Sequence, residues 1–242
     1  MFLYIWYLGV GLKFLVSGRL IIREWCRHLP CFSAFVFACT MKSLFLIPLY
    51  QTPLYSNVVR VLSPWVTILQ VAAGVEAFVL FAREVPMFRR FGLAMLLVFG
   101  AIAAGLVEWT APHNQTELAL ATTAALERGF GFAIALVLSV GIFFYRLFKD
   151  GKPRLAYWHA CCLAFLSVTN AVGWQMIQQK VETIYPTWIM VLGGAIPFAG
   201  WLLVMKESPT DWKLPLEVKF HHGRQSSDGA QSFRPWLSRT QL

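Results

Sequence analysis

Charged side chains inside long apolar segments are the first candidates for chemistry in this sequence. Glu76 lies about two-thirds of the way along the apolar run Val61–Ala82, and Lys42 interrupts the run Pro30–Tyr50. A charge at membrane depth costs several kcal/mol unless it is paired or hydrated, so such residues are often functional. Two interpretations of Glu76 stay open: a proton or ligand site, and a structural hydrogen bond to a neighbouring helix. An ion pair with Lys42 is one arrangement that the sequence allows.

The apolar run Leu155–Gln178 carries a polar stripe. Side chains on one face of a helix recur every three or four residues, and a polar face within a membrane turns toward the interior of the bundle. We expect this face to line a cavity or to join helices, and we expect its histidine to lie at the membrane interface. Because the other histidines lie in connections or in the tail, no pair of haem ligands is expected. The residues of the stripe are His159, Cys162, Asn170, Trp174 and Gln178.

Three further charges form a candidate cap at the outer end of the bundle. Glu127 and Arg128 open the most apolar part of a run that ends at Tyr145, and Glu108 closes the run Gly92–Thr110. Adjacent residues of a helix point about 100° apart, so Glu127 and Arg128 need not pair with each other. We expect solvation at the membrane rim to explain these charges.

The sequence lacks the short patterns of common active sites. It has no phosphate-binding loop, no zinc-protease pattern and no nucleophile-elbow pattern. Its five cysteines form no Cys-x-x-Cys pair, and the apolar run Thr187–Met205 has no lysine for a retinal Schiff base. We therefore predict no catalytic residue, no metal site and no cofactor.

The composition indicates that membrane helices hold these residues. Of the 242 residues, 57% are hydrophobic and only 14% are charged, against about 45–50% and about 25% in soluble domains. Seven segments approach the length that crosses a bilayer, about 20 apolar residues. They are Phe2–Val16, Pro30–Tyr50, Val61–Ala82, Gly92–Thr110, a run from near Leu118 to Tyr145, Leu155–Gln178 and Thr187–Met205.

The basic residues predict the orientation of the bundle. Most of the 21 Lys and Arg residues lie in the connections after the first, third and fifth segments and in the tail. Connections rich in Lys and Arg stay in the cytoplasm. We therefore predict an all-α bundle of seven membrane helices at residues 1–205, with the N-terminus outside, in a bacterial inner membrane. A basic, disordered cytoplasmic tail is expected at residues 206–242, and the net charge of +9 then reflects topology and not nucleic-acid binding.

Small residues predict close contacts between some of the helices. The fifth segment contains Gly129-x-x-x-Ala133 and Gly131-x-x-x-Ala135, and the seventh contains Gly193-Gly194. Small side chains let the backbones of membrane helices approach. Pro197 lacks a backbone donor and should bend the seventh helix near Gly193.

Three short features occur in a fixed order along residues 1–205. A basic connection from Arg23 leads to Pro-x-Phe ending at Phe32, Trp65 precedes Glu76 by three helical turns, and Leu126-Glu127-Arg128 opens the fifth segment. In these features the chain resembles a group of uncharacterised seven-helix membrane proteins that are abundant in acidobacterial genomes. The resemblance implies a fold and no activity.

Two classes of function remain. The first is a non-enzymatic sensor, receptor or complex subunit with a small-molecule or protein partner in the bilayer. The second is a small transporter or channel that uses Glu76 and the polar stripe. Transporters often have two repeated halves with broken helices, whereas only the seventh segment here has a proline near its middle. We therefore favour the first class.

Overall fold

A computed structural model describes residues 2–50, 52, 54–84, 118–148, 155–179 and 184–206, with single positions at 94, 98, 101, 102 and 105. The chain divides into two units, Met1–Asp211 and Trp212–Leu242, and every described residue belongs to the first. Apart from those single positions, the predicted fourth segment lies outside the described residues. The predicted tail beyond Lys206 lies outside them as well.

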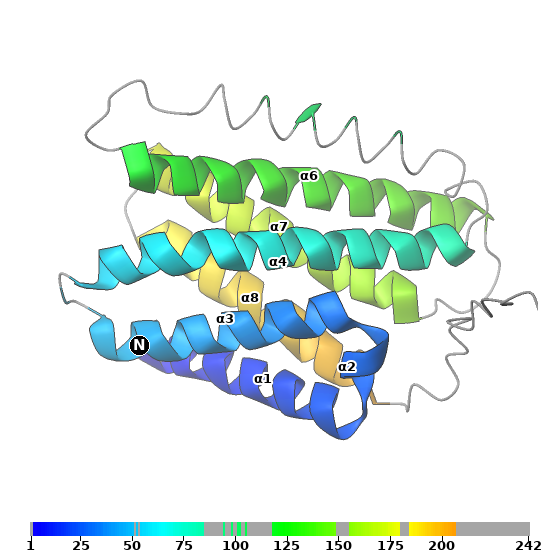
Figure 1. Ribbon diagram of the computed structural model, residues 1–242, viewed down its shortest axis with the longest axis horizontal. Helices are drawn as coiled ribbons and strands as arrows, with labels where there is room; N and C mark the ends of the chain where they lie inside the picture. Colours follow the sequence, from blue (N-terminus) through cyan, green and yellow to red (C-terminus); the bar gives the residue numbers. More distant parts are fainter. Residues whose placement is uncertain are drawn as a thin grey trace, which may run out of the picture. The chain divides into compact units, whose positions relative to one another are not determined.

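The described part of the chain consists of α-helices and contains no strand. A helix covers each of the six predicted segments that fall within it, so the all-α prediction is confirmed for these residues (Figure 1). Helix α2 is a single turn between two long helices. The helices are α1 (Phe2–Ile22), α2 (Trp25–His28), α3 (Pro30–Leu49), α4 (Leu54–Glu84), α6 (Leu118–Phe148), α7 (Leu155–Gln178) and α8 (Ile184–Val204).

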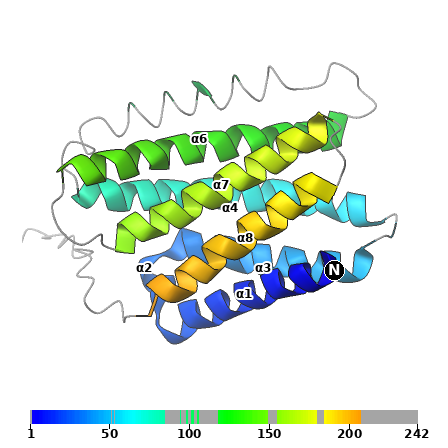
Figure 2. The same cartoon turned by 180° about the vertical axis from the view of Figure 1, so that it is seen from behind.

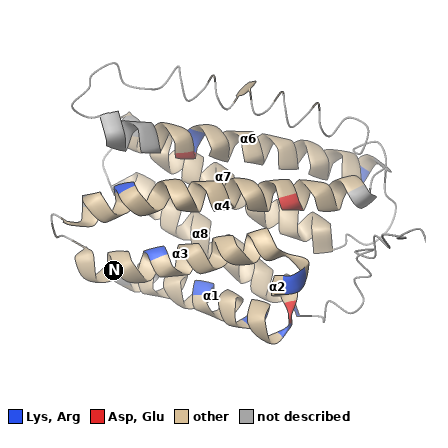
Figure 3. Cartoon of the chain, in the orientation of Figure 1, with Lys and Arg blue, Asp and Glu red and all other residues tan. Residues whose placement is uncertain are grey.

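Five of the described helices are long and apolar enough to cross a membrane: α3, α4, α6, α7 and α8. Helix α1 is 21 residues long but carries Lys13 and Arg19 within its apolar run. Few charged residues interrupt the long helices (Figure 3). Large apolar side chains such as Trp65 and Leu203 point outward and are 66% and 64% exposed, as lipid-facing residues are in a bundle. The chain has the helices of a multi-pass membrane protein.

The six long helices form a closed ring of contacts. In order around the ring, α1 packs on α3, α3 on α4, α4 on α6, α6 on α7, α7 on α8, and α8 on α1, and α4 also packs on α7 across it. Helices α3, α4 and α6 run side by side in one layer, and α7 and α8 cross behind it obliquely (Figures 1 and 2). A ring of six helices has an interior to which every long helix can contribute side chains.

Glycines set the close approach of the later helices. A Cβ on Gly131 of α6 would lie 3.0 Å from the carbonyl oxygen of Ser167 on α7. A Cβ on Gly193 of α8 would overlap the side chain of Thr169 on α7. Both glycines lie in segments that the sequence predicts as contact surfaces, and α8 continues as a helix through Pro197.

Two polar contacts fix the ends of helices. Helix α3 begins at Pro30, which has no backbone N–H to satisfy in the first turn. The next two N–H groups, of Cys31 and Phe32, donate to the carboxylate of Glu76 on α4. Helix α1 continues past the predicted end at Val16 and carries Arg19. Arg19 Nε donates to the carbonyl oxygen of Met205 at 2.8 Å, so a basic side chain satisfies a carbonyl at the end of α8.

Candidate functional site

A partly open cavity of about 610 Å³ lies among the long helices. Ligand pockets in proteins commonly have volumes of about 300–1,000 Å³ and mostly apolar walls. All six long helices contribute lining residues, and most of the lining is apolar or aromatic. The apolar and aromatic lining includes Trp6, Phe35, Leu46, Val59, Val66, Leu166, Trp174, Ile177, Met190, Val191 and Phe198.

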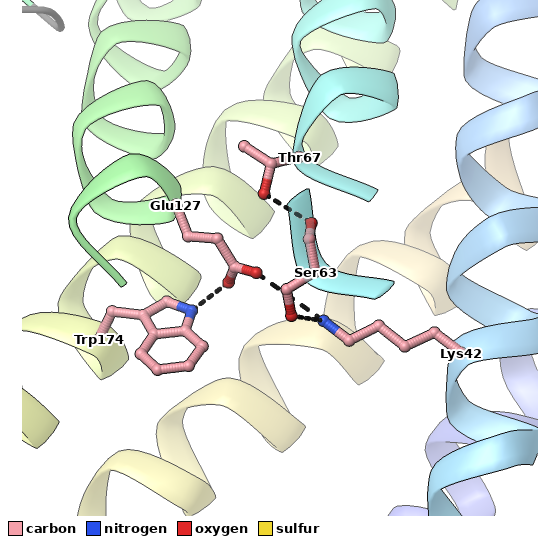
Figure 4. Close-up of polar contacts among 5 residues, drawn as sticks. All are labelled: Lys42, Ser63, Thr67, Glu127 and Trp174. Atoms are coloured by element: carbon pink, nitrogen blue, oxygen red, sulfur yellow. Dashed lines mark hydrogen bonds and ion pairs between the residues drawn. The ribbon is translucent and has the colours of Figure 1, made fainter. Parts of the chain in front are cut away.

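Lys42 of α3 lies at the centre of a polar network in the wall of the cavity (Figure 4). Its Nζ donates to Ser63 Oγ of α4 at 2.6 Å and lies 3.8 Å from Glu127 Oε1 of α6. The other oxygen of Glu127 accepts a hydrogen bond from the indole N–H of Trp174 on α7. One buried ion pair thus joins four helices.

Lys13 of α1 is the second cation of the cavity. Its Nζ donates to Ser43 Oγ of α3 at 2.7 Å and lies 5.8 Å from the ring centre of Phe198 on α8. Ser43 in turn donates to the carbonyl of Cys39 at 2.9 Å. Among the described residues no carboxylate lies within ion-pair distance of Lys13. The ammonium therefore faces the cavity without a counter-charge from this part of the chain.

The predicted outer cap is not a solvated rim in the described residues. Arg128 is only 4% exposed and donates to Gln175 Oε1 of α7 at 2.8 Å. Glu127 lines the cavity and pairs with Lys42. The two charges turn inward because α7 supplies amide and indole partners that a lipid-facing position lacks. Glu108 lies outside the described residues.

Glu76 lies outside the cavity lining. Its Oε1 accepts from the N–H of Cys31 at 3.2 Å and its Oε2 from the N–H of Phe32 at 2.8 Å. These donors belong to the first turn of α3, where no intrahelical partner exists and the helix dipole favours negative charge. The contacts match the structural interpretation of Glu76, and the Lys42 ammonium pairs with Glu127 in its place.

The polar stripe on α7 divides into two parts. Asn170 and Trp174 line the cavity, whereas Cys162 faces Gly200 of α8, where an added Cβ would lie 2.9 Å from the sulfur. The side chain of Gln178 lies outside the described residues. His159 is kept apart from the cavity.

His159 is completely buried within the bundle, and its place at the depth of the membrane interface stays a prediction. Its Nδ1 accepts a hydrogen bond of 3.2 Å from Trp201 Nε1, and its ring meets the edge of Phe32 at a centroid distance of 4.6 Å. The neighbouring α8 and the start of α3 cover it, which the sequence of α7 alone does not reveal. Among the described residues, no three His, Cys, Asp or Glu side chains gather as metal ligands would.

Several site residues were missed by the sequence analysis. Lys13 is not among the predicted site residues, although its position inside the first apolar run is a usable signal. The polar residues of α4, Ser63, Thr67 and Gln70, are all buried and recur at helical spacing on one face. Gln70 Nε2 donates to Ser167 Oγ of α7 at 2.9 Å, so this face joins α4 to α7.

Tyrosines line the cavity where α3 ends and α4 begins. Tyr50 and Tyr55 are among the lining residues, and their rings meet edge to face at 6.2 Å. Tyr55 precedes the apolar span that starts at Asn57. Burial raises the pKa of the Tyr55 phenol, and the neighbouring Tyr50 adds a smaller effect in the same direction. Tyr55 is therefore a neutral hydrogen-bonding group at neutral pH.

Comparison of the chain with protein-family models, with curated proteins and with solved structures finds no match. Function is therefore inferred from the chemistry of the cavity. Three features define the site: apolar walls from α1, α3, α4, α7 and α8, a Lys42–Glu127 ion pair, and the amino group of Lys13.

Proposed function

We propose that this chain is a non-enzymatic membrane protein of the receptor or sensor type, which binds a small molecule inside its helical ring. The proposal includes seven membrane spans, an outer N-terminus and a bacterial inner membrane. It rests on one observation, the cavity of about 610 Å³ to which every long described helix contributes. The bilayer and a small-molecule ligand are its partners.

The position of the cavity supports a receptor role. A ligand can shift a conformational equilibrium only by binding one arrangement more tightly than another. A molecule in the cavity contacts helices that meet at seven interfaces among the described long helices. Its arrival or departure would change how the helices pack, and such a change would reach the basic connections that we place in the cytoplasm.

A small transporter is the second candidate, and the ion pair in the cavity wall favours it. Lys42 and Glu127 lie on α3 and α6, and their described partners are the hydroxyl of Ser63 on α4 and the indole of Trp174 on α7. Such a pair could open and close a route along the polar face of α7. Uptake of a bound ligand by sealed proteoliposomes separates the two candidates, because a receptor binds the ligand without accumulating it.

The proposed function is tested by ligand-induced stabilisation of the purified protein in nanodiscs. A library of small amphiphiles is screened for a rise in melting temperature, and each hit is repeated on Gly194→Leu. Gly194 lines the cavity, and a Cβ there meets no atom within 4 Å. The larger side chain should therefore fill the cavity without displacing a helix.

A ligand of the cavity should stabilise the wild-type protein and lose that effect in Gly194→Leu. Binding at a hundred times its Kd stabilises a protein by about 2.7 kcal/mol, which is readily visible in a melting curve. Hits that stabilise both proteins equally bind elsewhere. A screen with only such hits would contradict the proposed function.

A further inference from the structure

We infer that the cavity binds a monovalent organic anion, a carboxylate with an apolar body, whose charged end is held by Lys13 and whose body lies against the apolar walls. This inference rests on the proposed function, since it names the class of ligand for the same cavity.

The charges of the lining residues support an anion. The side chains among them that can carry a charge are Lys13, Lys42 and Glu127. Glu127 is engaged by Lys42 at 3.8 Å and by the indole of Trp174. The described lining therefore has one more basic group than acidic groups, and the basic group without a carboxylate partner there is Lys13.

A single negative charge completes this balance. An ammonium in apolar surroundings is unfavourable without a partner, and electrostatic attraction is stronger there than in water. A monoanion would neutralise Lys13 and leave the Lys42–Glu127 pair intact. A dianion would place a second, uncompensated negative charge within the ring, and a cation would add to the existing excess.

The hydrogen bonds at Lys13 leave room for a carboxylate. An ammonium group has three N–H donors and no acceptor. One donor is used by Ser43 Oγ at 2.7 Å, and the hydroxyl of Ser43 is itself committed to the carbonyl of Cys39. The other two donors have no hydrogen-bond partner among the described residues, so they are available to the oxygens of a ligand.

The walls of the cavity require that the anion have an apolar body. Phe198 lies near the charged end, and Phe35, Leu46, Val66 and Leu166 extend the apolar lining. Burial of apolar surface contributes about 25 cal/mol per Å². A bare inorganic anion would gain none of this, whereas a fatty or aryl carboxylate would gain it along its whole body. An anionic bilayer lipid shares part of this chemistry, and the experiment distinguishes it.

The test measures binding of three probes of equal chain length, octanoate, octylammonium and octanol, to the protein in nanodiscs of neutral lipid. Wild type is compared with Lys13→Met, which keeps the length of the side chain and removes its charge. Lys206→Met is the matched control, because Lys206 is exposed at the end of α8 and does not line the cavity.

Octanoate should bind wild type and Lys206→Met equally and should bind Lys13→Met at least about tenfold more weakly, since a charged hydrogen-bonding partner is lost. Octanol should bind more weakly than octanoate and should be indifferent to Lys13. Equal binding of octanoate to all three proteins would overturn the inference, as would preference for octylammonium.

A second measurement keeps Lys13 in place and does not depend on the folding of the variant. In a protein whose only cysteine is Cys39, which lines the cavity, the reaction rates of an anionic and a cationic methanethiosulfonate are compared. A protein with only Cys26, on α2 and away from the cavity, is the control. The anionic reagent should be favoured at Cys39 relative to Cys26, and an equal or reversed preference would overturn the inference.

The outcomes separate the inference from the proposed function. Binding of octanol and octanoate that Gly194→Leu abolishes but Lys13→Met leaves unchanged would retain the ligand cavity and reject its anion selectivity. Displacement of octanoate by phosphatidylglycerol, and not by benzoate, would assign the charge to a lipid headgroup and reject the inference. Failure of every probe to bind, together with no reaction at Cys39, would reject both.

Discussion

The carboxylate of Glu76 on α4 accepts a hydrogen bond of 2.8 Å from the backbone N–H of Phe32 in the first turn of α3. The N–H of Cys31 donates to the other oxygen at 3.2 Å. Both donors lie at a helix N-terminus, which leaves four N–H groups without partners and favours negative charge. This contact explains how a half-buried carboxylate is accommodated in an apolar segment, where it has no ion pair with a described residue.

The capping role of Glu76 predicts how two substitutions will differ. Glu76→Gln keeps one accepting oxygen and should lower the free energy of unfolding by about 1 kcal/mol, whereas Glu76→Leu leaves both N–H groups unpaired and should lower it by roughly 2–3 kcal/mol. Thermal unfolding in detergent micelles measures both. The Glu76→Gln substitution should leave ligand binding in the cavity unchanged. Loss of binding in a Gln variant that melts normally would restore a functional role for this carboxylate.

Much of the fold could be predicted because apolar length and helix length follow the same physical constraint. Leu155–Gln178 is predicted and observed with the same ends, since polar connections bound it on both sides. Helix α4 starts earlier than its apolar run, at Leu54. Arg60 ends the apolar run but not the helix, because arginine is a good helix former. Hydropathy therefore marks the buried length of a helix better than its ends.

The site was harder to predict because sequence gives depth but not neighbours. Lys42 lies seven residues before the end of α3 at Leu49, and Glu127 lies nine residues after the start of α6 at Leu118. At 1.5 Å per residue both are roughly 10–14 Å from the helix ends that they approach. Their depths therefore agree, but only the folded ring shows that α4 presents the small Ser63 between them, where a long lysine side chain can pass.

The adjacent glycines of α8 provide a matched pair of packing tests. Gly193→Ala places a Cβ on the side chain of Thr169, whose hydroxyl is held by the carbonyls of Phe165 and Leu166. It should destabilise the protein by about 1–3 kcal/mol. Gly194→Ala meets open space and should be neutral or stabilise by up to about 1 kcal/mol through helix propensity. Melting temperatures in one detergent decide the comparison. Equal losses at both positions would contradict the observed contact between α7 and α8.

The orientation of the membrane helices can be tested with residues in the described connections. Thr52 lies between α3 and α4 and is exposed, and Cys26 lies on the single-turn α2. If basic connections are cytoplasmic, a membrane-impermeant maleimide added to intact cells should label Thr52→Cys in a cysteine-free background. The same reagent should label a protein whose only cysteine is Cys26 after the cells are lysed, and not while they are intact. The opposite pattern would invert the proposed topology.

The ion pair between Lys42 and Glu127 predicts strong coupling in a double-mutant cycle. The side chains are 21% and 14% exposed, so removal of one partner leaves a charge in surroundings that water hardly reaches. Loss of a partner from a buried pair destabilises proteins by about 3–5 kcal/mol, and the remaining exposure here should reduce the effect to roughly 2–3 kcal/mol for Lys42→Met or Glu127→Gln.

The double variant should be more stable than the sum of the two losses predicts, because neither charge then lacks its partner. Residues in direct contact show coupling energies of about 0.5–3 kcal/mol, and we expect a value in the upper half of that range. Urea or thermal unfolding of the four proteins in one detergent gives the cycle. Additive losses would mean that the coupling energy between Lys42 and Glu127 is zero. In that case Ser63 and Trp174 alone would hold the two side chains, and the excess charge of the cavity could no longer be assigned to Lys13.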